Sequence, residues 1–249
     1  MEKIRIGKAW FDNITMTECL EKIRDSLGQG NKGFIIAANV DNVLILERDS
    51  EFRSAYENAQ IVLADGMPLI LASRLLGTPL KEKVSGSDLF PSLCRLAAGE
   101  GYKLFFLGGE EGVARKAADH FQKSWENLRV VGMYSPPFGF EKNDAENRRI
   151  IHLINQARPD ILFVALGAPK QEKWMCRHLP ELEVVLALGV GASFDFAAGT
   201  KKRAPVLWQK ASLEWFWRFL QEPRRLFKRY FIDDLFPFAF LVLKQLLEK

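Results

Sequence analysis

Two unbroken apolar runs, each ending abruptly in glycine and polar residues, constrain the fold of this chain more than any other feature. Residues 161–166 form the first run and residues 184–188 the second. They lead into Gly167-Ala168-Pro169-Lys170-Gln171 and into Gly189-Val190-Gly191-Ala192-Ser193-Phe194-Asp195. Apolar runs without polar alternation are typical of strands covered on both faces, as in a parallel sheet. Since the residues between the runs have helical spacing, we expect a strand, helix, strand unit with polar loops at its carboxyl ends, where open α/β sheets bind ligands.

The same alternation of strand and helix runs through the preceding residues. We expect a strongly buried strand at 34–38, further strands at 61–64 and 102–107, a short strand at 129–134, and a short edge strand within 4–11, with helices between them. Thr15 and Glu18 have the spacing of a capping box, and Pro68 suits the first turn of a later helix. The pattern predicts a Rossmann-like, doubly wound and mostly parallel α/β sheet.

Charge and composition change after Gly199. The chain has 249 residues, which fits one α/β core at 1–199 with a helical appendage at 200–249. The formal net charge is only +4, but lysines and arginines crowd into the appendage. They indicate an anionic partner, which could be phosphate groups, nucleic acid or a membrane surface.

Aromatic residues lie among these cations, and the apolar run 236–243 is too short to cross a bilayer. Aromatic residues interleaved with cations are typical of a segment at a lipid interface. Packing on the core or on a neighbouring subunit is an equal alternative for Trp215 and Trp217.

The remaining composition excludes several classes of site. Cys19, Cys94 and Cys176 lack the spacing of metal or redox motifs, so we expect reduced core thiols. No Asp-x-Asp pair ends a strand, and the sequence predicts neither a divalent metal site nor a cofactor. The amino terminus lacks a long apolar region and a cleavage site, which predicts a protein that faces the cytoplasm.

Five predicted strands end in polar or glycine-rich loops. These loops begin at Asn39, at Asp65, at Gly108-Gly109, at 167–171 and at 189–195. If the strands are parallel neighbours, the loops converge on one edge, where the following helices offer free backbone amides with partial positive charge. Such an edge suits a diphosphate. The Gly108-Gly109 turn alone is weak evidence, because it lacks the full dinucleotide fingerprint.

Two aspartates in these loops have alternative interpretations. Asp65 could cap the helix that begins near Pro68, which local sequence favours, or it could act as a general base that takes the proton from an attacking hydroxyl. Asp195 lies between two phenylalanines and could either anchor its loop or bind sugar hydroxyls. A departing diphosphate would need positive charge, which helix termini and the basic tail can supply.

The ordered set of motifs resembles the WecG/TagA/CpsF glycosyltransferases over nearly the whole chain. The segments that carry the resemblance are Asn39-Val40-Asp41-Asn42, Ala64-Asp65-Gly66-Met67-Pro68, Val84-Ser85-Gly86-Ser87-Asp88, Phe106-Leu107-Gly108-Gly109, Gly167-Ala168-Pro169-Lys170-Gln171-Glu172, Gly189-Val190-Gly191-Ala192-Ser193-Phe194-Asp195, Arg203-Ala204-Pro205, Glu214-Trp215 and Glu222-Pro223-Arg224-Arg225. The resemblance implies an inverting, metal-independent transferase that moves a sugar from a UDP-sugar to a polyprenyl-diphosphate-linked saccharide. In TagA-like members the sugar is N-acetylmannosamine, the acceptor is undecaprenyl-diphosphate-N-acetylglucosamine, and the product enters wall teichoic acid. Relatives transfer N-acetylmannosaminuronic acid or glucose.

The resemblance also implies a role for particular residues. The family's proposed base falls on Asp65, and its substrate contacts fall on positions in the loops and in the tail. The expected substrate-binding residues are Asn39, Lys83, Gly108, Gly109, Gln171, Gly189, Gly191, Asp195, Arg218, Arg225 and Lys228. Two positions depart from the family pattern: Ala37 stands where Thr is common, and Lys83 stands where Arg is usual. Ala37 lacks the hydroxyl contact to substrate that Thr would make, and Lys cannot bind phosphate in the bidentate way that Arg can. Both departures therefore bear on the choice of sugar.

The implied partners are a UDP-sugar donor, a lipid-linked acceptor and an anionic membrane surface, with no nucleic acid. The implied location is the inner face of the bacterial cell membrane, and some members self-associate into homo-oligomers. Two other classes are open on the residues alone. One is a nicotinamide-dependent oxidoreductase, which the incomplete glycine fingerprint disfavours, and the other is a non-catalytic membrane or nucleic-acid adaptor that uses the basic tail.

Overall fold

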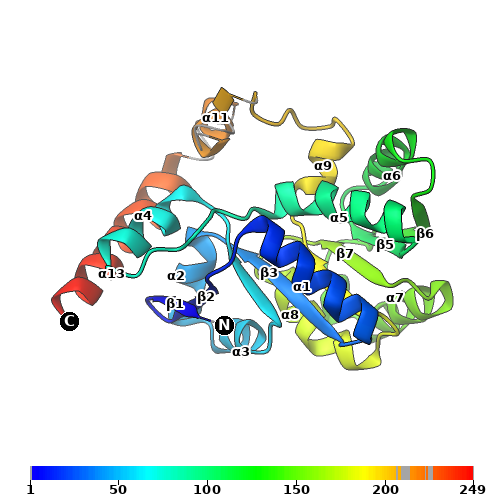
Figure 1. Ribbon diagram of the computed structural model, residues 1–249, viewed down its shortest axis with the longest axis horizontal. Coiled ribbons are helices and arrows are strands. Elements are labelled where there is room, and N and C mark those ends of the chain that lie inside the picture. The colour runs from blue at the N-terminus through cyan, green and yellow to red at the C-terminus, as the bar shows by residue number, and fades with distance from the viewer. Residues whose placement is uncertain (1, 206, 209–213, 222, 224–226, 249) are drawn as a thin grey trace.

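The computed structural model describes residues 2–205, 207–208, 214–221, 223 and 227–248 (Figure 1). Its centre is a six-stranded sheet in the order β4-β3-β8-β7-β5-β6, in which every neighbouring pair is parallel. The strands are β3 (Gly33–Ala38), β4 (Ile61–Ala64), β5 (Lys103–Gly108), β6 (Arg129–Tyr134), β7 (Ile161–Ala165) and β8 (Leu186–Gly189). The predicted doubly wound parallel sheet is confirmed.

Alternate residues of each strand enter two separate apolar layers. In β7, for example, Phe163 lies in the layer on one face and Val164 in the layer on the other, and both are fully buried. Both faces are therefore buried along β3, β4, β5, β7 and β8, which explains why the sequences of these strands are mostly apolar, whereas the edge strand β6 has no fully buried residue.

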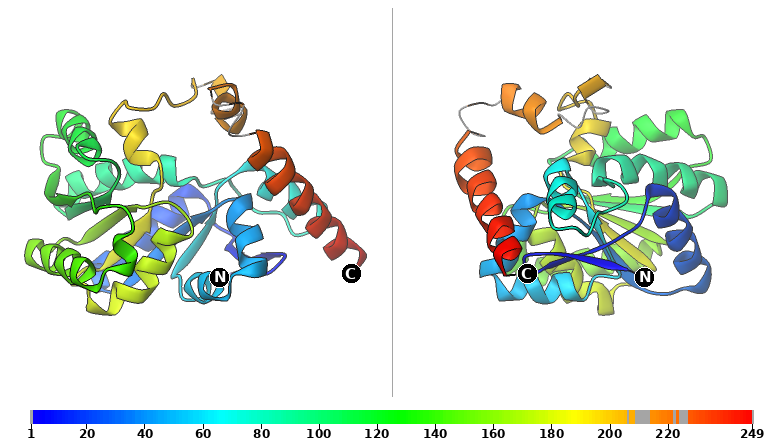
Figure 2. Two further views of the ribbon diagram at one scale, coloured as in Figure 1. Left: turned by 180° about the vertical axis from the view of Figure 1, so that it is seen from behind. Right: turned by 60° about the vertical axis from the view of Figure 1, so that its left-hand side comes forward.

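Helices cover the two faces (Figures 1 and 2). One face is packed by α1 (Met16–Gln29), α5 (Gly86–Glu100), α6 (Val113–Ser124) and α9 (Ser193–Ala197). The other is packed by α2 (Val40–Arg48), α3 (Ser50–Glu57), α4 (Met67–Leu75), α7 (Asp144–Ala157) and α8 (Lys170–His178). Short 3₁₀ turns, η1 (Phe140–Lys142) and η2 (Leu179–Glu181), complete the connections. The predicted capping box is present, since Thr15 and Glu18 each bind the other's backbone N–H at the start of α1.

The first strand is not an edge strand of this sheet. Instead β1 (Lys3–Ile6) and β2 (Ala9–Asp12) form a separate antiparallel hairpin. Gly7 turns the chain between them with a φ of +60°, a conformation that glycine adopts without strain. The hairpin is joined to the core through Asp12, whose Oδ2 accepts the Val62 N–H at 2.8 Å. The single strand expected within 4–11 is therefore wrong, because the turn divides it.

The tail is helical and its last helix packs on the core. It contains α11 (Glu214–Gln221), the π-helical segment η3 (Lys228–Leu235) and α13 (Phe236–Leu247). Phe238 and Val242 of α13 are buried in the same apolar layer as α2 and the hairpin. The Gly7 N–H also donates to Gln245 Oε1 at 2.7 Å, so the first and last segments of the chain are in contact. Among the described residues, no helix is both long enough and apolar enough to span a membrane.

Candidate active site

The five loops that follow β3, β4, β5, β7 and β8 lie together at the carboxyl-terminal ends of the strands, because all these strands are parallel. We call this end of the sheet the loop edge. Backbone hydrogen bonds continue between the loops beyond the ends of the strands. The Asp65 N–H donates to the Ala38 carbonyl at 2.8 Å, and the Val190 N–H donates to the Val164 carbonyl at 2.8 Å. The predicted convergence of the loops is confirmed.

Asp65 does not cap the helix that follows it. The N-cap position of α4 is Gly66, which has no side chain to offer, and Pro68 lies in the first turn as expected. Asp65 Oδ2 instead accepts a hydrogen bond of 3.2 Å from the backbone N–H of Gly86, the first residue of α5. The carboxylate is thus held across the loop edge by a different helix from the one that local sequence suggested.

Burial raises the pKa of Asp65 from its ordinary value of 3.8 to about 6. The Gly86 N–H and the positive charge of Lys83 oppose this shift, while the carboxylates of Asp88 and Glu214 add to it. A carboxylate with a pKa near 6 is largely ionised at neutral pH and is more basic than an exposed aspartate. Such a group is well matched to general-base catalysis.

Small residues keep the space beside Asp65 open. A methyl group placed on Gly86 would lie 3.4 Å from the Ala37 Cβ, 3.7 Å from the Gly189 carbonyl oxygen and 4.0 Å from Asp65 Oδ2. These four residues, from β3, the end of β4, α5 and β8, therefore meet at one point. Ala37 is one of the two departures from the family pattern, and it lies here, within van der Waals range of the Gly86 position.

Gln171 links two of the predicted glycine-rich loops. Its Oε1 accepts the Gly191 N–H at 3.2 Å, and its side chain lies over Gly189, where a methyl group would come within 2.6 Å of Nε2. Only glycine fits at that point while Gln171 keeps its position. Gln171, Gly189 and Gly191 thus form one unit next to Asp65.

Glu172 fixes the orientation of the Gln171 amide. It is only 2% exposed, and its Oε1 accepts the Gln171 Nε2–H at 2.8 Å. Burial raises the pKa of Glu172 to about 7, and the nearby charge of Asp41 adds to the shift. Because Nε2 is committed to Glu172, the Gln171 oxygen is the atom that faces the Gly191 amide.

Gly108 and Gly109 form a close turn against the neighbouring strand and α9. A methyl group on Gly108 would lie 2.4 Å from the Ala165 carbonyl oxygen, and one on Gly109 would lie 3.5 Å from the Phe194 ring. Asp195, the next residue in α9, accepts from the Thr200 hydroxyl at 3.2 Å and pairs with Lys201 at 3.3 Å. Asp195 thus anchors its loop, one of the two roles predicted for it.

Asn39 and Lys83 lie at the other end of the loop edge. Asn39 is exposed and caps α2, where its Oδ1 accepts the Asn42 N–H at 3.2 Å. The ammonium of Lys83 lies 4.0 Å from Asp88 Oδ2 and 3.9 Å from Glu214 Oε2. The predicted phosphate-binding cation therefore faces one carboxylate from the core and one from the tail.

The predicted basic residues of the tail are only partly described. The backbone of Arg218 lies in α11 but its side chain is outside the described part of the chain, as is all of Arg225. Lys228 is exposed at the start of η3. These three positions remain predictions.

Three residues of this region were not singled out from sequence as site residues: Gly86, Glu172 and Arg203. The guanidinium of Arg203 is bonded to Asp88 Oδ1 and, at 2.9 Å, to Glu214 Oε1. The family motifs could have indicated these three residues, because each of them lies in a segment that carries the resemblance. The contacts of Gly86 and Arg203 are with residues far away in the chain and could not be read from local sequence, whereas Glu172 bonds its neighbour Gln171.

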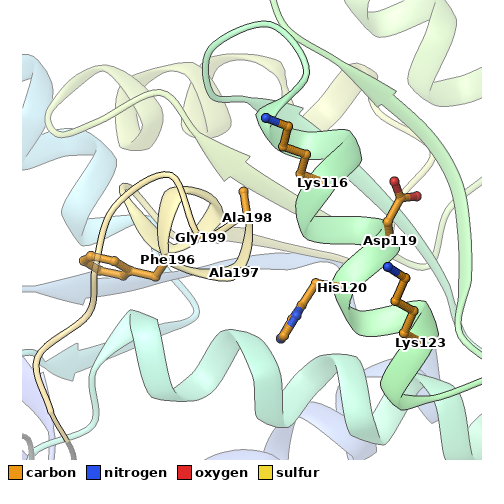
Figure 3. Close-up of a pocket in the computed structure, with 8 residues that line it drawn as sticks. All are labelled: Lys116, Asp119, His120, Lys123, Phe196, Ala197, Ala198 and Gly199. Atoms are coloured by element: carbon orange, nitrogen blue, oxygen red, sulfur yellow. The ribbon is translucent and has the colours of Figure 1, made fainter.

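A surface pocket of about 410 Å³ lies apart from this loop edge (Figure 3). It is formed between α6 and the end of α9, and its lining consists of Lys116, Asp119, His120, Lys123, Phe196, Ala197, Ala198 and Gly199. None of these is a predicted site residue. Throughout the described ranges, no group of three or more His, Cys, Asp or Glu side chains is placed to hold a metal ion.

The fold and the loop edge define a Rossmann-like α/β protein with a carboxylate at the carboxyl ends of its strands. Comparison with known proteins identifies the class further, since the model of the glycosyl transferase WecG/TagA/CpsF family matches residues 4–249. The chain belongs to this family and is a glycosyltransferase. This result overturns the oxidoreductase and adaptor alternatives.

Relatives from three strains of Staphylococcus aureus, MW2, NCTC 8325 and MRSA252, are each 30% identical over 226 residues. The matched region is 90% of this chain and 87% of each relative. All three are named N-acetylglucosaminyldiphosphoundecaprenol N-acetyl-beta-D-mannosaminyltransferase.

Proposed function

We propose that this glycosyltransferase moves N-acetylmannosamine from UDP-N-acetylmannosamine to undecaprenyl-diphosphate-linked N-acetylglucosamine, in the synthesis of a teichoic acid linkage unit. The names of the S. aureus relatives support this acceptor and this sugar. Transfer of N-acetylmannosaminuronic acid or glucose to another lipid-linked saccharide is the second candidate, because the departures at Ala37 and Lys83 from the family pattern bear on the choice of sugar. A screen of UDP-sugar donors with one lipid-linked N-acetylglucosamine acceptor decides between them.

One observation carries the proposed chemistry: Asp65 lies at the loop edge with its carboxylate held by the Gly86 N–H and its pKa raised to about 6. Asp65 takes the proton of the acceptor hydroxyl while that oxygen attacks the anomeric carbon of the donor. The bond from this carbon to the UDP oxygen breaks on the opposite side, which inverts the configuration. The Asp65 carboxyl group then releases the proton to solvent.

The departing UDP gains negative charge that the loop edge can stabilise. Helices α2, α5, α6 and α8 begin at this edge, and each presents backbone N–H groups and a partial positive charge. Lys83 adds a cation whose side chain is 19% exposed. We propose that these groups, together with Arg218, Arg225 and Lys228 of the tail, stabilise the leaving group without a metal ion.

The outer surface of α13 supports a location at the membrane. Four of its apolar side chains are 54–79% exposed and recur at helical spacing along one side: Phe236, Phe240, Leu243 and Leu247. Leu71 and Leu75 of α4 are exposed at the same end of the molecule (Figures 1 and 2). We propose that this end contacts the cytoplasmic face of the membrane, where the lipid-linked acceptor resides.

The variant Asp65→Asn tests the catalytic proposal. Asparagine can still accept the Gly86 N–H but cannot take a proton, so turnover should fall by about 10²-fold or more, within the range for loss of a general base. UDP binding, measured by calorimetry, and thermal stability should stay near the wild-type values. Turnover close to wild type would remove Asp65 from the mechanism.

The transfer assay also tests metal independence. Activity should be unaffected by EDTA, and activity lost with EDTA and restored by manganese would contradict metal independence.

A further inference from the structure

Arg203 joins the tail to the first turn of α5, the turn whose Gly86 N–H holds the candidate base. It follows α9, and its guanidinium lies between Asp88 of α5 and Glu214 of α11. Nη2 bonds Asp88 Oδ1, Nε bonds Glu214 Oε1 at 2.9 Å, and Nη1 lies 3.4 Å from the Ser87 carbonyl. The side chains of Arg203 and Glu214 are each 23% exposed, so this is not a pair of freely solvated surface charges.

The Asp88 carboxylate is in turn part of the structure that holds Asp65. Its Oδ2 accepts from the Ser85 hydroxyl at 2.6 Å, and the Ser85 oxygen accepts the Asp88 N–H at 3.2 Å. These bonds form the first turn of α5, whose Gly86 N–H donates to Asp65. A continuous path of hydrogen bonds and backbone therefore leads from α11 through Arg203 to the carboxylate of Asp65.

We infer that Arg203 and Glu214 are positioning residues that lock the tail onto the first turn of α5, so that Asp65 is correctly oriented only when α11 is docked. The inference rests on the proposed role of Asp65 as the base. Through these two residues, turnover on the lipid-linked acceptor would depend on whether the tail is docked.

The chemistry of the cluster requires arginine at position 203. A guanidinium presents donors along two directions in one plane and can bind two carboxylates at once, whereas an ammonium is a single point of charge. With Lys83 close to the same two carboxylates, the cluster contains two cations and two anions. Although burial opposes it, hydrogen bonds from Ser85 and Arg203 hold the pKa of Asp88 below its usual range.

The charged groups that face Asp65 are Lys83, Asp88 and Glu214. Loss of Arg203 should release α11, which carries the Glu214 carboxylate away from Asp65 and so should lower the pKa of Asp65. Removal of the Glu214 charge should also lower it. If the tail stayed docked without Arg203, Glu214 would remain near Asp65, and the acid limb of the pH–rate profile would not move to lower pH in Arg203→Ala.

The test compares Arg203→Ala, Arg203→Lys and Glu214→Gln in the full chain. For Arg203→Ala we expect kcat to fall roughly 10- to 100-fold, as for a slightly misplaced catalytic group, with a smaller change in the KM for the UDP-sugar. Hydrogen exchange should become faster in 214–221, and the acid limb should move to lower pH. Arg203→Lys should recover part of kcat, and Glu214→Gln should move the limb to lower pH.

Arg24→Ala is the matched control, because Arg24 forms an exposed ion pair of 2.6 Å with Glu100 far from the loop edge. It should leave every readout unchanged. The inference would be overturned if Arg203→Ala had the kcat, the pH–rate profile and the hydrogen exchange of the wild type. If Arg203→Ala does not fold, the same measurements on Glu214→Gln test the inference. If the wild-type protein itself shows no transfer, the proposed function fails, while the exchange of 214–221 still decides whether Arg203 docks the tail.

Discussion

Two carboxyl groups at the loop edge lie in environments that oppose their ionisation. Asp65 and Glu172 both have raised pKa values, near 6 and near 7, and in both cases burial is the main cause. The two groups differ in access. Asp65 is half-buried beside small residues, whereas Glu172 is enclosed, and its Oε2 has no hydrogen-bond partner within the described part of the chain. Asp65 is therefore suited to exchange a proton with a substrate, and Glu172 is suited to orient Gln171.

The enclosed position of Glu172 gives a testable effect of pH on stability. Its folded pKa of about 7 lies above the ordinary 4.5, so its ionisation destabilises the fold progressively as pH rises from about 4.5 to 7. Glutamine stays neutral and can still accept from Gln171. Glu172→Gln should therefore increase the free energy of unfolding at about pH 8 by on the order of 2–3 kcal/mol, with little change near pH 5.

Urea denaturation at the two pH values measures this difference. Glu110→Gln is a suitable control, because Glu110 is exposed in the loop after β5. An equal effect of Glu172→Gln at both pH values would show that its charge does not act on the fold.

At the scale of the element, local sequence predicted a strand or helix correctly wherever the residues that determine it lie within that element. The apolar runs of β7 and β8 predicted buried parallel strands, and Thr15 with Glu18 predicted the start of α1. The hairpin was missed because its division depends on one left-handed glycine, Gly7, inside an otherwise strand-like stretch. The capping role favoured for Asp65 was wrong because its hydrogen-bond partner, Gly86, belongs to a helix that begins 21 residues later.

Helix α13 has two apolar sides with different environments, and its outer side gives the next prediction. Phe240 and Leu243 are 70% and 54% exposed, so aspartate at these positions should be tolerated by the fold. Phe240→Asp with Leu243→Asp should weaken binding to vesicles of anionic lipid by about tenfold or more, since two apolar side chains no longer enter the interface.

Vesicle sedimentation measures this effect. Phe138→Asp is the control, because Phe138 is fully exposed in the loop after β6, away from α13. Unchanged binding of the double variant would mean that the outer side of α13 does not contact lipid.

The whole molecule depends on contacts between residues that are remote in sequence. Arg203 meets Asp88 across 115 positions, and Gly7 meets Gln245 across 238. Parallel sheet topology could be predicted from the order of strands and helices, and with it the meeting of the five loops. No rule of spacing could pair Arg203 with Asp88, because that contact exists only after the tail has crossed the loop edge.

These contacts bear on the proposed division at residue 199. A chain that ends at Gly199 keeps the whole six-stranded sheet and should fold, but it loses the buried Phe238 and Val242. Loss of their burial removes roughly 3–5 kcal/mol, which corresponds to a decrease in Tm of about 10 °C.

Calorimetry of the truncated and full chains measures the change in Tm, and transfer to the lipid-linked acceptor should be nearly abolished in the truncated chain. The full-length variant Phe238→Ala separates the two effects, since it loses core packing while Arg203 and α11 are retained. An undiminished rate in the truncated chain would show that the tail has no part in catalysis.

The contact between Gly7 and Gln245 also has a consequence for synthesis of the protein. A chain grows from its amino end and its early segments fold first. The hairpin and α2 are complete long before α13 is translated, so their apolar outer side chains stay uncovered until α13 has been synthesised. The surface that we assign to lipid is therefore assembled after the sheet, and a growing polypeptide that still lacks α13 has neither this surface nor the cover over its amino-terminal hairpin.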